Sequence, residues 1–269
     1  MTALMEDLSV TLVQTGIHWK NTDANLAMYE EKLWAAKPST DLIVLPEMFN
    51  TGFTTDARKY AEPMNGKTFR WMKLIADQFK AVVTGSIIIH DQQRFYNRLI
   101  WMEPGGRHHF YDKRHLFSIA GEDRQFSSGS AAPPFTWKGW KIKPLVCYDL
   151  RFPVWSRNRG EKNSENLAYD LILFVANWPA SRISVWDTLL RARAIENSAY
   201  CLGVNRVGSD GEGIDYNGHS CIYNSRGESL IEVTEEETIP TANLSYLALL
   251  EYRKKFPVHF DADDFEIKS

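Results

Sequence analysis

The chain has 269 residues, of which 44% are hydrophobic and 24% are charged, and its formal net charge is −3 at pH 7. This composition is typical of a globular protein with a sizeable core, and without a basic surplus it gives no support for nucleic acid or an anionic membrane as a partner. Three cysteines, Cys147, Cys201 and Cys221, form no Cys-x-x-Cys pair and cannot all be paired within one chain, which favours a reducing compartment over a disulfide framework.

The first seven residues carry acids where a signal peptide carries bases. No apolar run approaches the roughly 20 residues that a membrane-spanning helix needs. We therefore expect a soluble cytoplasmic protein.

The first half of the chain alternates predicted strands with predicted helices. Apolar runs at residues 8–14, 41–45 and 81–89 predict strands, and apolar residues repeat along one face of predicted helices at 25–36 and 67–80. The turn at 103–106 separates two further strand patterns, 95–102 and 107–111, and predicts a hairpin. Antiparallel strands therefore join the sheet, and we expect it to be mixed.

The second half begins with residues 112–134, which lack a clean period and predict a long structured loop. One expected strand ends at 146, and five more cover 171–176, 200–207, 220–224, 230–233 and 241–244. One expected helix begins near 153, and two more cover 186–197 and 245–256. A polar insertion at 161–166 and a turn at 208–213 separate some of these elements. No shift in composition marks a domain boundary, so we expect one domain over residues 1–269 with a C-terminal arm from about 245 to 269.

This alternation of helices with apolar strands predicts an α/β fold with helices over the sheet faces. Periodicity alone does not separate two sheets between helical layers from one wide doubly wound sheet.

Cys147 ends a short apolar run and is followed by a turn and by Pro153, which suits the first turn of a helix. Backbone N–H groups at a helix start and a nearby cation both favour the thiolate, the form that attacks carbonyls. We therefore expect an acidic, nucleophilic thiol. Taken alone, a cysteine in an apolar run is more often a small buried side chain.

Two other ionisable residues also follow predicted strands. Glu47 comes directly after the strand at 41–45, and Lys113 follows the hairpin. If these strands lie side by side, one sheet edge presents a carboxylate, a cation and the Cys147 thiol together, which is where α/β proteins place their ligands.

The same residues lie in three blocks that resemble the signatures of the nitrilase, or carbon–nitrogen hydrolase, superfamily. The blocks are Leu-Pro-Glu-Met-Phe at 45–49, Tyr-Asp-Lys-Arg-His-Leu-Phe at 111–117 and Val-Cys-Tyr-Asp-Leu-Arg-Phe-Pro at 146–153. Segments at 177–179, 192–197 and 203–208 are similar to later family blocks, so the resemblance runs from about 8 to about 260. Within the superfamily the chain looks most like the bacterial ω-amidase branch, whose members act on 2-oxoglutaramate and 2-oxosuccinamate.

This resemblance implies a four-layer αββα sandwich that forms a homodimer through its sheet-covering helices, with larger assemblies possible. It also implies a small amide as substrate, with water as the second reactant, and no metal or organic cofactor. His108 and His109 lack further partners at ligand spacing, so we expect no metal site there.

Amide hydrolysis needs a nucleophile, a proton donor and an oxyanion stabiliser. We expect Cys147 to attack and form a thioester and Glu47 to transfer the protons. Lys113, together with the backbone N–H of Tyr148, is expected to hold the oxyanion and to lower the pKa of the thiol. Glu122 resembles the family's second glutamate, which orients the lysine.

Specificity for a 2-oxo acid amide calls for a cation that binds the distal carboxylate. Arg182 is the first candidate and Arg114 the second, while Trp178 and Phe117 are candidates for apolar walls that exclude water. Asp112 and Arg151 flank the motifs, and we interpret them as structural residues that satisfy each other or buried loop carbonyls.

Several other functions remain open from the sequence. Deaminated-glutathione amidase, N-carbamoyl amidohydrolase and true nitrilase belong to the same superfamily, and the first would need a longer pocket. A Cys–His hydrolase that uses His115 is a further possibility. The alternative outside enzymes is a non-catalytic interaction protein that keeps the fold.

Overall fold

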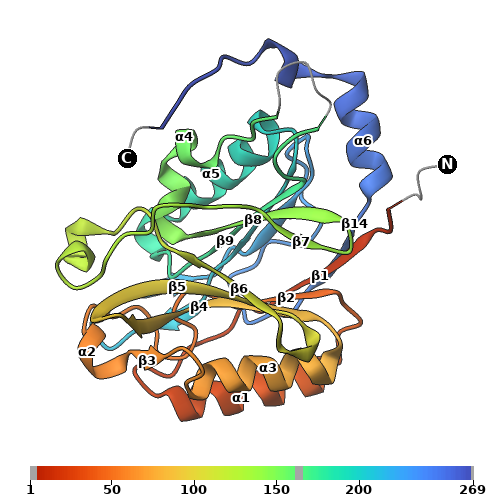
Figure 1. Cartoon of the computed structure of the whole chain (residues 1–269). Coiled ribbons are helices and arrows are strands. Elements are labelled where there is room, and N and C mark those ends of the chain that lie inside the picture. Colours follow the sequence, from red (N-terminus) through yellow and green to blue (C-terminus); the bar gives the residue numbers. More distant parts are fainter. Residues whose placement is uncertain (1–4, 161–165, 268–269) are drawn as a thin grey trace.

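Two β-sheets lie face to face, and helices cover the outer face of each sheet (Figure 1). This computed structural model describes residues 5–160 and 166–267. The layers follow the order helix, sheet, sheet, helix, so the expected αββα sandwich with mixed sheets is confirmed. Five of the six residues of the polar insertion, 161–165, lie outside the described part.

The first sheet has seven strands, six of them in the order β14-β1-β2-β4-β5-β6, and β3 pairs with β4. Strands β1, β2 and β4 run parallel, whereas β5, β6 and β14 join antiparallel. The strands are β1 (Leu8–Leu12), β2 (Leu42–Val44), β3 (Glu62–Pro63), β4 (Val82–Asp91), β5 (Arg94–Met102), β6 (His108–Asp112) and β14 (Thr241–Leu244).

The second sheet has five strands in the order β13-β10-β9-β8-β7, with β8, β9 and β10 parallel at its centre. A separate two-stranded hairpin pairs β11 (Val207–Ser209) with β12 (Asp215–Asn217). The strands of the second sheet are β7 (Phe135–Trp137), β8 (Trp140–Val146), β9 (Leu171–Val175), β10 (Tyr200–Val204) and β13 (Cys221–Tyr223).

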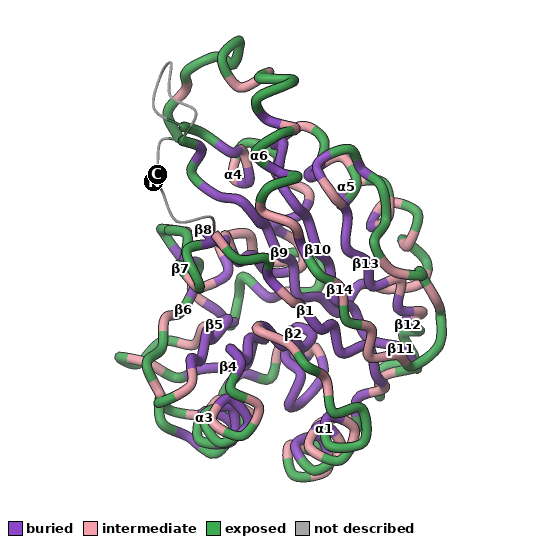
Figure 2. Tube along the Cα trace, turned by 90° about the vertical axis from the view of Figure 1, so that its right-hand side faces the viewer, coloured by how far each residue is buried: buried purple, intermediate pink, exposed green. Residues whose placement is uncertain are grey.

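Helices α1 (Thr22–Ala36) and α3 (Lys67–Phe79) cover the first sheet, and α5 (Ile183–Glu196) and α6 (Tyr246–Lys255) lie over the second (Figure 1). The side chains of β2 show why this sheet needs cover on both faces. Leu42 and Val44 pack into the cluster between the sheets, whereas Ile43 packs toward the helices. Figure 2 shows the buried strands at the centre and the exposed outer turns of the helices. The described residues also form two short α-helices, α2 (Ala57–Tyr60) and α4 (Pro153–Ser156).

Some sequence-based boundaries are wrong. Residues 230–233 form no strand, and the side chains of Leu230 and Val233 are 38% and 37% exposed, so that segment has no buried face to support strand pairing. The strand expected at 200–207 ends at Val204, and the chain then turns into the β11–β12 hairpin. The helix expected near Pro153 is only the four-residue α4, and a 3₁₀ turn, η4 (Cys147–Arg151), precedes it.

Within the described ranges, no helix combines the length and apolar character needed to cross a bilayer.

Candidate active site

Four chain segments meet at one edge of the sandwich. Glu47 follows β2, Lys113 follows β6, Cys147 follows β8 and Asn177 follows β9. The parallel arrangement of β8 and β9, and of β1, β2 and β4 in the facing sheet, brings carboxyl ends of strands to this edge. The structure therefore brings together the three ionisable residues that the sequence placed after strands.

Cys147 adopts left-handed backbone angles, with φ of 44°, which is uncommon for a residue other than glycine. The turn is fixed by Asp149, whose Oδ2 accepts hydrogen bonds from the backbone N–H of Val146 at 3.0 Å and from the Tyr111 hydroxyl at 2.8 Å. The backbone N–H of His115 donates to the other oxygen of Asp149 at 3.0 Å. One buried carboxylate therefore holds the cysteine turn and the loop after Lys113 in register.

Lys113 lies between two buried carboxylates. Its Nζ is 2.9 Å from Glu47 Oε1 and 2.8 Å from Glu122 Oε2, and all three side chains are at most 1% exposed. The Asn97 side-chain amide donates to the same Glu47 oxygen at 2.8 Å and to Glu122 Oε1 at 3.1 Å. The backbone N–H of Phe117 donates to Glu122 Oε2 at 2.6 Å. Lys113 and Glu47 thus have one fixed relative position.

The charges at this centre oppose the effect of burial on the lysine. Burial alone lowers the pKa of Lys113, but the carboxylates of Glu122 and Glu47 outweigh it and raise that pKa above its usual range. Lys113 therefore remains a cation.

The pKa of the Cys147 thiol is raised well above its ordinary value, first by burial and then by the charge of Glu47, while Lys113 acts in the opposite direction. The expectation of an acidic thiol is therefore wrong for the free protein, although Lys113 does lower the pKa as expected. The sulfur remains a protonated thiol beside a carboxylate that can accept its proton.

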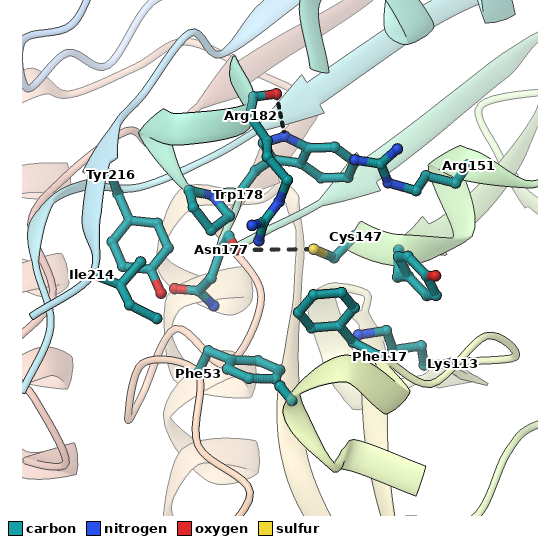
Figure 3. Close-up of a pocket in the computed structure, with 13 residues that line it drawn as sticks. Phe53, Lys113, Phe117, Cys147, Arg151, Asn177, Trp178, Arg182, Ile214 and Tyr216 are labelled. Atoms are coloured by element: carbon teal, nitrogen blue, oxygen red, sulfur yellow. Dashed lines mark hydrogen bonds between the residues drawn. The ribbon is translucent and has the colours of Figure 1, made fainter. Parts of the chain in front are cut away.

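The Cys147 side chain opens into a pocket with about 530 Å³ of empty space, its mouth included. Figure 3 shows Cys147, Asn177 and Trp178 around the pocket, with the Arg182 side chain pointing into it. Phe117 and Trp178 both line the pocket, as expected for its apolar walls, and Tyr148 lies next to Cys147 in the lining. The Arg182 guanidinium carbon is 5.6 Å from the centre of the Phe117 ring.

Arg151 also lines this pocket, with its guanidinium carbon 5.2 Å from the centre of the Trp178 ring. Asp112 instead binds Arg98, with Arg98 Nε 2.7 Å from Asp112 Oδ1. The interpretation that Asp112 and Arg151 satisfy each other is therefore wrong. The register of β5 and β6 places Arg98 directly opposite Asp112, which accounts for this pair.

Two other candidates lie elsewhere. Arg114 is not among the residues that line the pocket; its Nη1 donates to the Gly129 carbonyl at 3.1 Å and its guanidinium carbon is 5.5 Å from the Trp155 ring centre. His115 Nδ1 is 2.7 Å from Asp149, and its ring stacks on Phe152, so the structure gives it no place beside the thiol. Among the described residues there is no group of three or more His, Cys, Asp or Glu side chains that could hold a metal ion.

Sequence reasoning missed several residues of the site. Asn97 lies beside Arg98 in the predicted strand at 95–102, and Asn177 belongs to the segment at 177–179 that is similar to a later family block, so only Asn177 stood in a recognisable motif. Phe53, Ile214 and Tyr216 also line the pocket, yet Phe53 and Ile214 come from turns and Tyr216 from the three-residue strand β12, none of which gave a periodic signal. Their position depends on the tertiary fold.

Comparisons with known proteins agree with this geometry. The carbon–nitrogen hydrolase family model matches residues 9–253. The chain is 45% identical to "Omega-amidase YafV" of Escherichia coli (strain K12), over 98% of this chain and 100% of that protein. It is 30% identical to "2-oxoglutaramate amidase" of Bacillus subtilis (strain 168), over 94% and 96% of the two chains.

Among solved structures, the chain is similar to XC1258 from Xanthomonas campestris, described as a CN-hydrolase superfamily protein with an arsenic adduct in the active site. The two share 42% identity and a TM-score of 0.94, over 98% of this chain and 100% of that one. Similarity over nearly the whole length, in both sequence and structure, leaves no large part of the fold unaccounted for. The chain belongs to the carbon–nitrogen hydrolase family.

Proposed function

We propose that the protein is an ω-amidase that hydrolyses the ω-amide of short 2-oxo dicarboxylic acid monoamides, such as 2-oxoglutaramate and 2-oxosuccinamate, to the 2-oxo acid and ammonia. The observation that carries the proposal is that Lys113 and Cys147 line one small pocket together with two guanidinium groups, while Glu47 lies buried behind them, 2.9 Å from Lys113 Nζ. The similarity to an omega-amidase and to a 2-oxoglutaramate amidase supports the same substrate class.

The proposed reaction begins with a protonated thiol. Glu47 takes the proton of Cys147 as the sulfur attacks the amide carbon, and then gives it to the departing nitrogen, so that ammonia leaves and a thioester remains. Water then attacks the thioester carbon and passes a proton to Glu47. The carbon–sulfur bond breaks, and the proton returns to sulfur. The coupling of the Cys147 pKa to Glu47 supports this direct transfer.

We assign the stabilisation of the developing oxyanion to Lys113 and to the backbone N–H of Tyr148. Tyr148 is the second residue of η4, and the first N–H groups of a helical turn have no acceptor within it. One preorganised donor of this kind typically contributes about 3–4 kcal/mol to the transition state. Glu122 is assigned the task of orienting Lys113, which fits its two contacts with Nζ.

Arg182 and Arg151 are the proposed partners of the substrate carboxylate. Neither guanidinium forms an ion pair with a carboxylate from residues 5–160 or 166–267, and each lies over an aromatic ring of the pocket wall, with its carbon 5.2 Å (Arg151) or 5.6 Å (Arg182) from the ring centre. A guanidinium without a carboxylate partner keeps its N–H groups available for bidentate binding of a substrate carboxylate. Arg114 receives no such role because it lies outside the lining.

We also propose that residues 1–269 form one catalytic domain, with the arm from about 245 to 269 as part of it, and that the protein is a cytoplasmic homodimer or larger homo-oligomer. Exposed apolar side chains on the helices over the second sheet support self-association; Ile195, Leu247 and Leu250 are 46%, 51% and 42% exposed. The cysteines, which are all free, fit a reducing compartment.

The test is ammonia release from 2-oxoglutaramate by the wild type and by Cys147→Ala. We expect steady release by the wild type and none above background from the variant. Unchanged activity in the variant would contradict the mechanism. Running N-carbamoyl amino acids, a deaminated-glutathione substrate and a nitrile in parallel, scored by kcat/KM, separates the proposed substrate class from its relatives.

The carboxylate role is tested with Arg182→Ala and Arg151→Ala. We expect each to weaken kcat/KM for carboxylate-bearing amides about tenfold or more, and to change it far less for neutral short amides. Arg114→Ala is the matched control because its guanidinium binds a backbone carbonyl outside the pocket. Equal losses on charged and neutral amides would remove the affected arginine from this role.

A further inference from the structure

The β11–β12 hairpin supplies part of the pocket lining. Its turn contributes Ile214 and its second strand contributes Tyr216. Figure 3 shows these two side chains on the other side of Asn177 from Cys147. Tyr216 is 5% exposed, whereas Ile214 is 40% exposed, so Tyr216 forms the inner part of this wall and Ile214 lies nearer the mouth.

A buried arginine holds the hairpin in place. Arg206 is 1% exposed and forms no ion pair with a carboxylate within the described ranges; its guanidinium bonds to backbone carbonyls of Ile17, Val207 and Ser209. The guanidinium carbon lies 4.6 Å from the centre of the Tyr216 ring. Arg206 therefore connects the loop after β1, through Ile17, to the strand β11 and to the Tyr216 ring that lines the pocket.

The turn itself is fixed by Asp210. Its Oδ1 accepts hydrogen bonds from the backbone N–H groups of Glu212 and Ile214 at 2.9 and 3.0 Å, and its Oδ2 accepts one from the Tyr216 hydroxyl at 2.9 Å. Gly213 has φ of 77°, which a larger side chain would disfavour. The two lining residues of the hairpin are thus held by the same carboxylate.

The hairpin lies next to the proposed carboxylate-binding arginine. Strand β12 packs against η5 (Ala180–Arg182), the 3₁₀ turn that carries Arg182. A substrate must place its amide carbon at Cys147 and, under the proposed function, its carboxylate at Arg182 or Arg151. On the hairpin side of the pocket, Tyr216 and Ile214 fill the space beyond the arginine that would bind the carboxylate.

We propose that the β11–β12 hairpin sets the upper limit on the length of the acyl chain, with Tyr216 and Ile214 as specificity-determining residues and Arg206 as the residue that positions them. This inference rests on the proposed function, because it concerns which amides reach Cys147. It separates short 2-oxo acid amides from the longer amides that a deaminated-glutathione amidase accepts. A chain with the same catalytic residues and a smaller hairpin would accept the longer substrates.

The test compares kcat/KM for a homologous series of ω-monoamides of increasing chain length. For Tyr216→Ala and Ile214→Ala we expect the ratio of long-chain to short-chain kcat/KM to rise about tenfold or more, since one methylene of pocket space is typically worth that discrimination. Tyr216→Phe is the control: it removes the bond to Asp210 but keeps the ring, and its ratio should stay at the wild-type value. An equal loss on every chain length in the alanine variants would overturn the proposal.

Arg206 is tested through Tyr216. Arg206→Met should raise the same ratio in the wild-type background and leave it unchanged in the Tyr216→Ala background, because the ring that it positions is then absent. A loss of thermal stability with no change in ratio would show that Arg206 has only a structural role and would contradict this part of the proposal.

A second measurement does not require amidase activity. The rate of Cys147 alkylation is measured with iodoacetamide and with a longer N-substituted iodoacetamide, using Cys147→Ala to subtract labelling of the other thiols. Tyr216→Ala should increase the rate with the longer reagent relative to the shorter one. If the wild type hydrolyses no amide but this ratio still rises, the proposed function fails and the inference on the hairpin stands. If the ratio does not rise, the hairpin proposal is wrong.

Discussion

Asn177 is joined to Glu47 by two hydrogen bonds. The backbone N–H of Asn177 donates to Glu47 Oε2 at 3.0 Å, and its side-chain amide donates to the Glu47 backbone carbonyl at 2.6 Å. Glu47 follows a strand of the first sheet and Asn177 follows a strand of the second, so these bonds connect the two sheets at the site. Because Lys113 occupies the other oxygen of Glu47, the carboxylate is held from both sides.

The first prediction concerns this connection. Asn177→Ala removes the side-chain bond to Glu47, and we expect kcat for the short amide to fall about 10- to 100-fold, since a small misplacement of a catalytic group is costly. The free energy of unfolding should fall by about 1–2 kcal/mol. The measurements are steady-state kinetics and denaturant unfolding.

Asn158→Ala is the matched control. The Asn158 side-chain amide also donates to two buried backbone carbonyls, those of Tyr169 and Asn197, and Asn158 does not line the pocket. It should lose comparable stability while keeping kcat per folded molecule. A similar loss of kcat in both variants would show that Asn177 has no specific connection with catalysis.

The second prediction concerns the charge of Lys113. Glu122 is the larger of the two carboxylate contributions that raise the pKa of Lys113, so Glu122→Gln should lower that pKa. The cation is then lost at a lower pH, and the alkaline limb of kcat/KM against pH should move to lower pH than in the wild type. Asp123→Asn, in the same 3₁₀ turn but exposed, should leave the limb in place. If the alkaline limb does not move in Glu122→Gln, the charge of Lys113 does not control kcat/KM in this pH range.

The parts of the fold that the sequence predicted are those with a strong local pattern. The apolar run at β2 and the spaced apolar residues of α3 depend on burial alone, and both elements were predicted within a few residues. The ionisable residues after strands were also predicted together, because parallel strands bring their carboxyl ends to one edge.

The errors concern contacts that no local pattern encodes. Arg98 pairs with Asp112 through the register of two strands, and this register cannot be obtained from the spacing of Asp112 and Arg151. The β11–β12 hairpin consists of two three-residue strands, too short to give a periodic pattern, and it is bonded through the buried Arg206 to Ile17, which is distant in the sequence. The raised pKa of Cys147 depends on how deeply the sulfur is enclosed and how close Glu47 lies, which are also tertiary properties.

The third prediction follows from that pKa. The negative charge of Glu47 raises the pKa of Cys147, so Glu47→Gln should lower it even though the same substitution removes the proposed proton acceptor. We expect thiolate absorbance near 240 nm to appear at lower pH in Glu47→Gln than in the wild type, while amidase activity falls by several orders of magnitude. Cys147→Ala supplies the background from other thiols. If thiolate appears at the same or a higher pH, Glu47 and Cys147 are not electrostatically coupled.

The fourth prediction concerns the stability of the strand that carries the cysteine. Lys143 lies on β8, and burial together with the positive charge of Arg159 lowers its pKa to about 8, against an ordinary value of 10.5, with Asp149 acting weakly in the opposite direction. Between about pH 8 and pH 10.5 the unfolded chain therefore binds more protons than the folded one. The contribution of Lys143 to the free energy of unfolding rises with pH across that window and is least favourable below pH 8.

Lys143→Met keeps much of the side-chain volume and removes this titration. The free energy of unfolding of the variant minus that of the wild type should decrease by about 1–3 kcal/mol between pH 7.5 and pH 10.5, because only the wild type gains stability over the window. At neutral pH the variant gains stability because it no longer buries an ammonium group, but it also loses the hydrogen bond from Lys143 Nζ to the Trp155 carbonyl, which offsets part of that gain. Lys141→Met is the matched control two residues earlier on the same face of the strand, and urea unfolding at both pH values is the measurement. A difference that does not depend on pH, or one that depends on it equally in the control, would show that the ammonium of Lys143 is not destabilised by its surroundings.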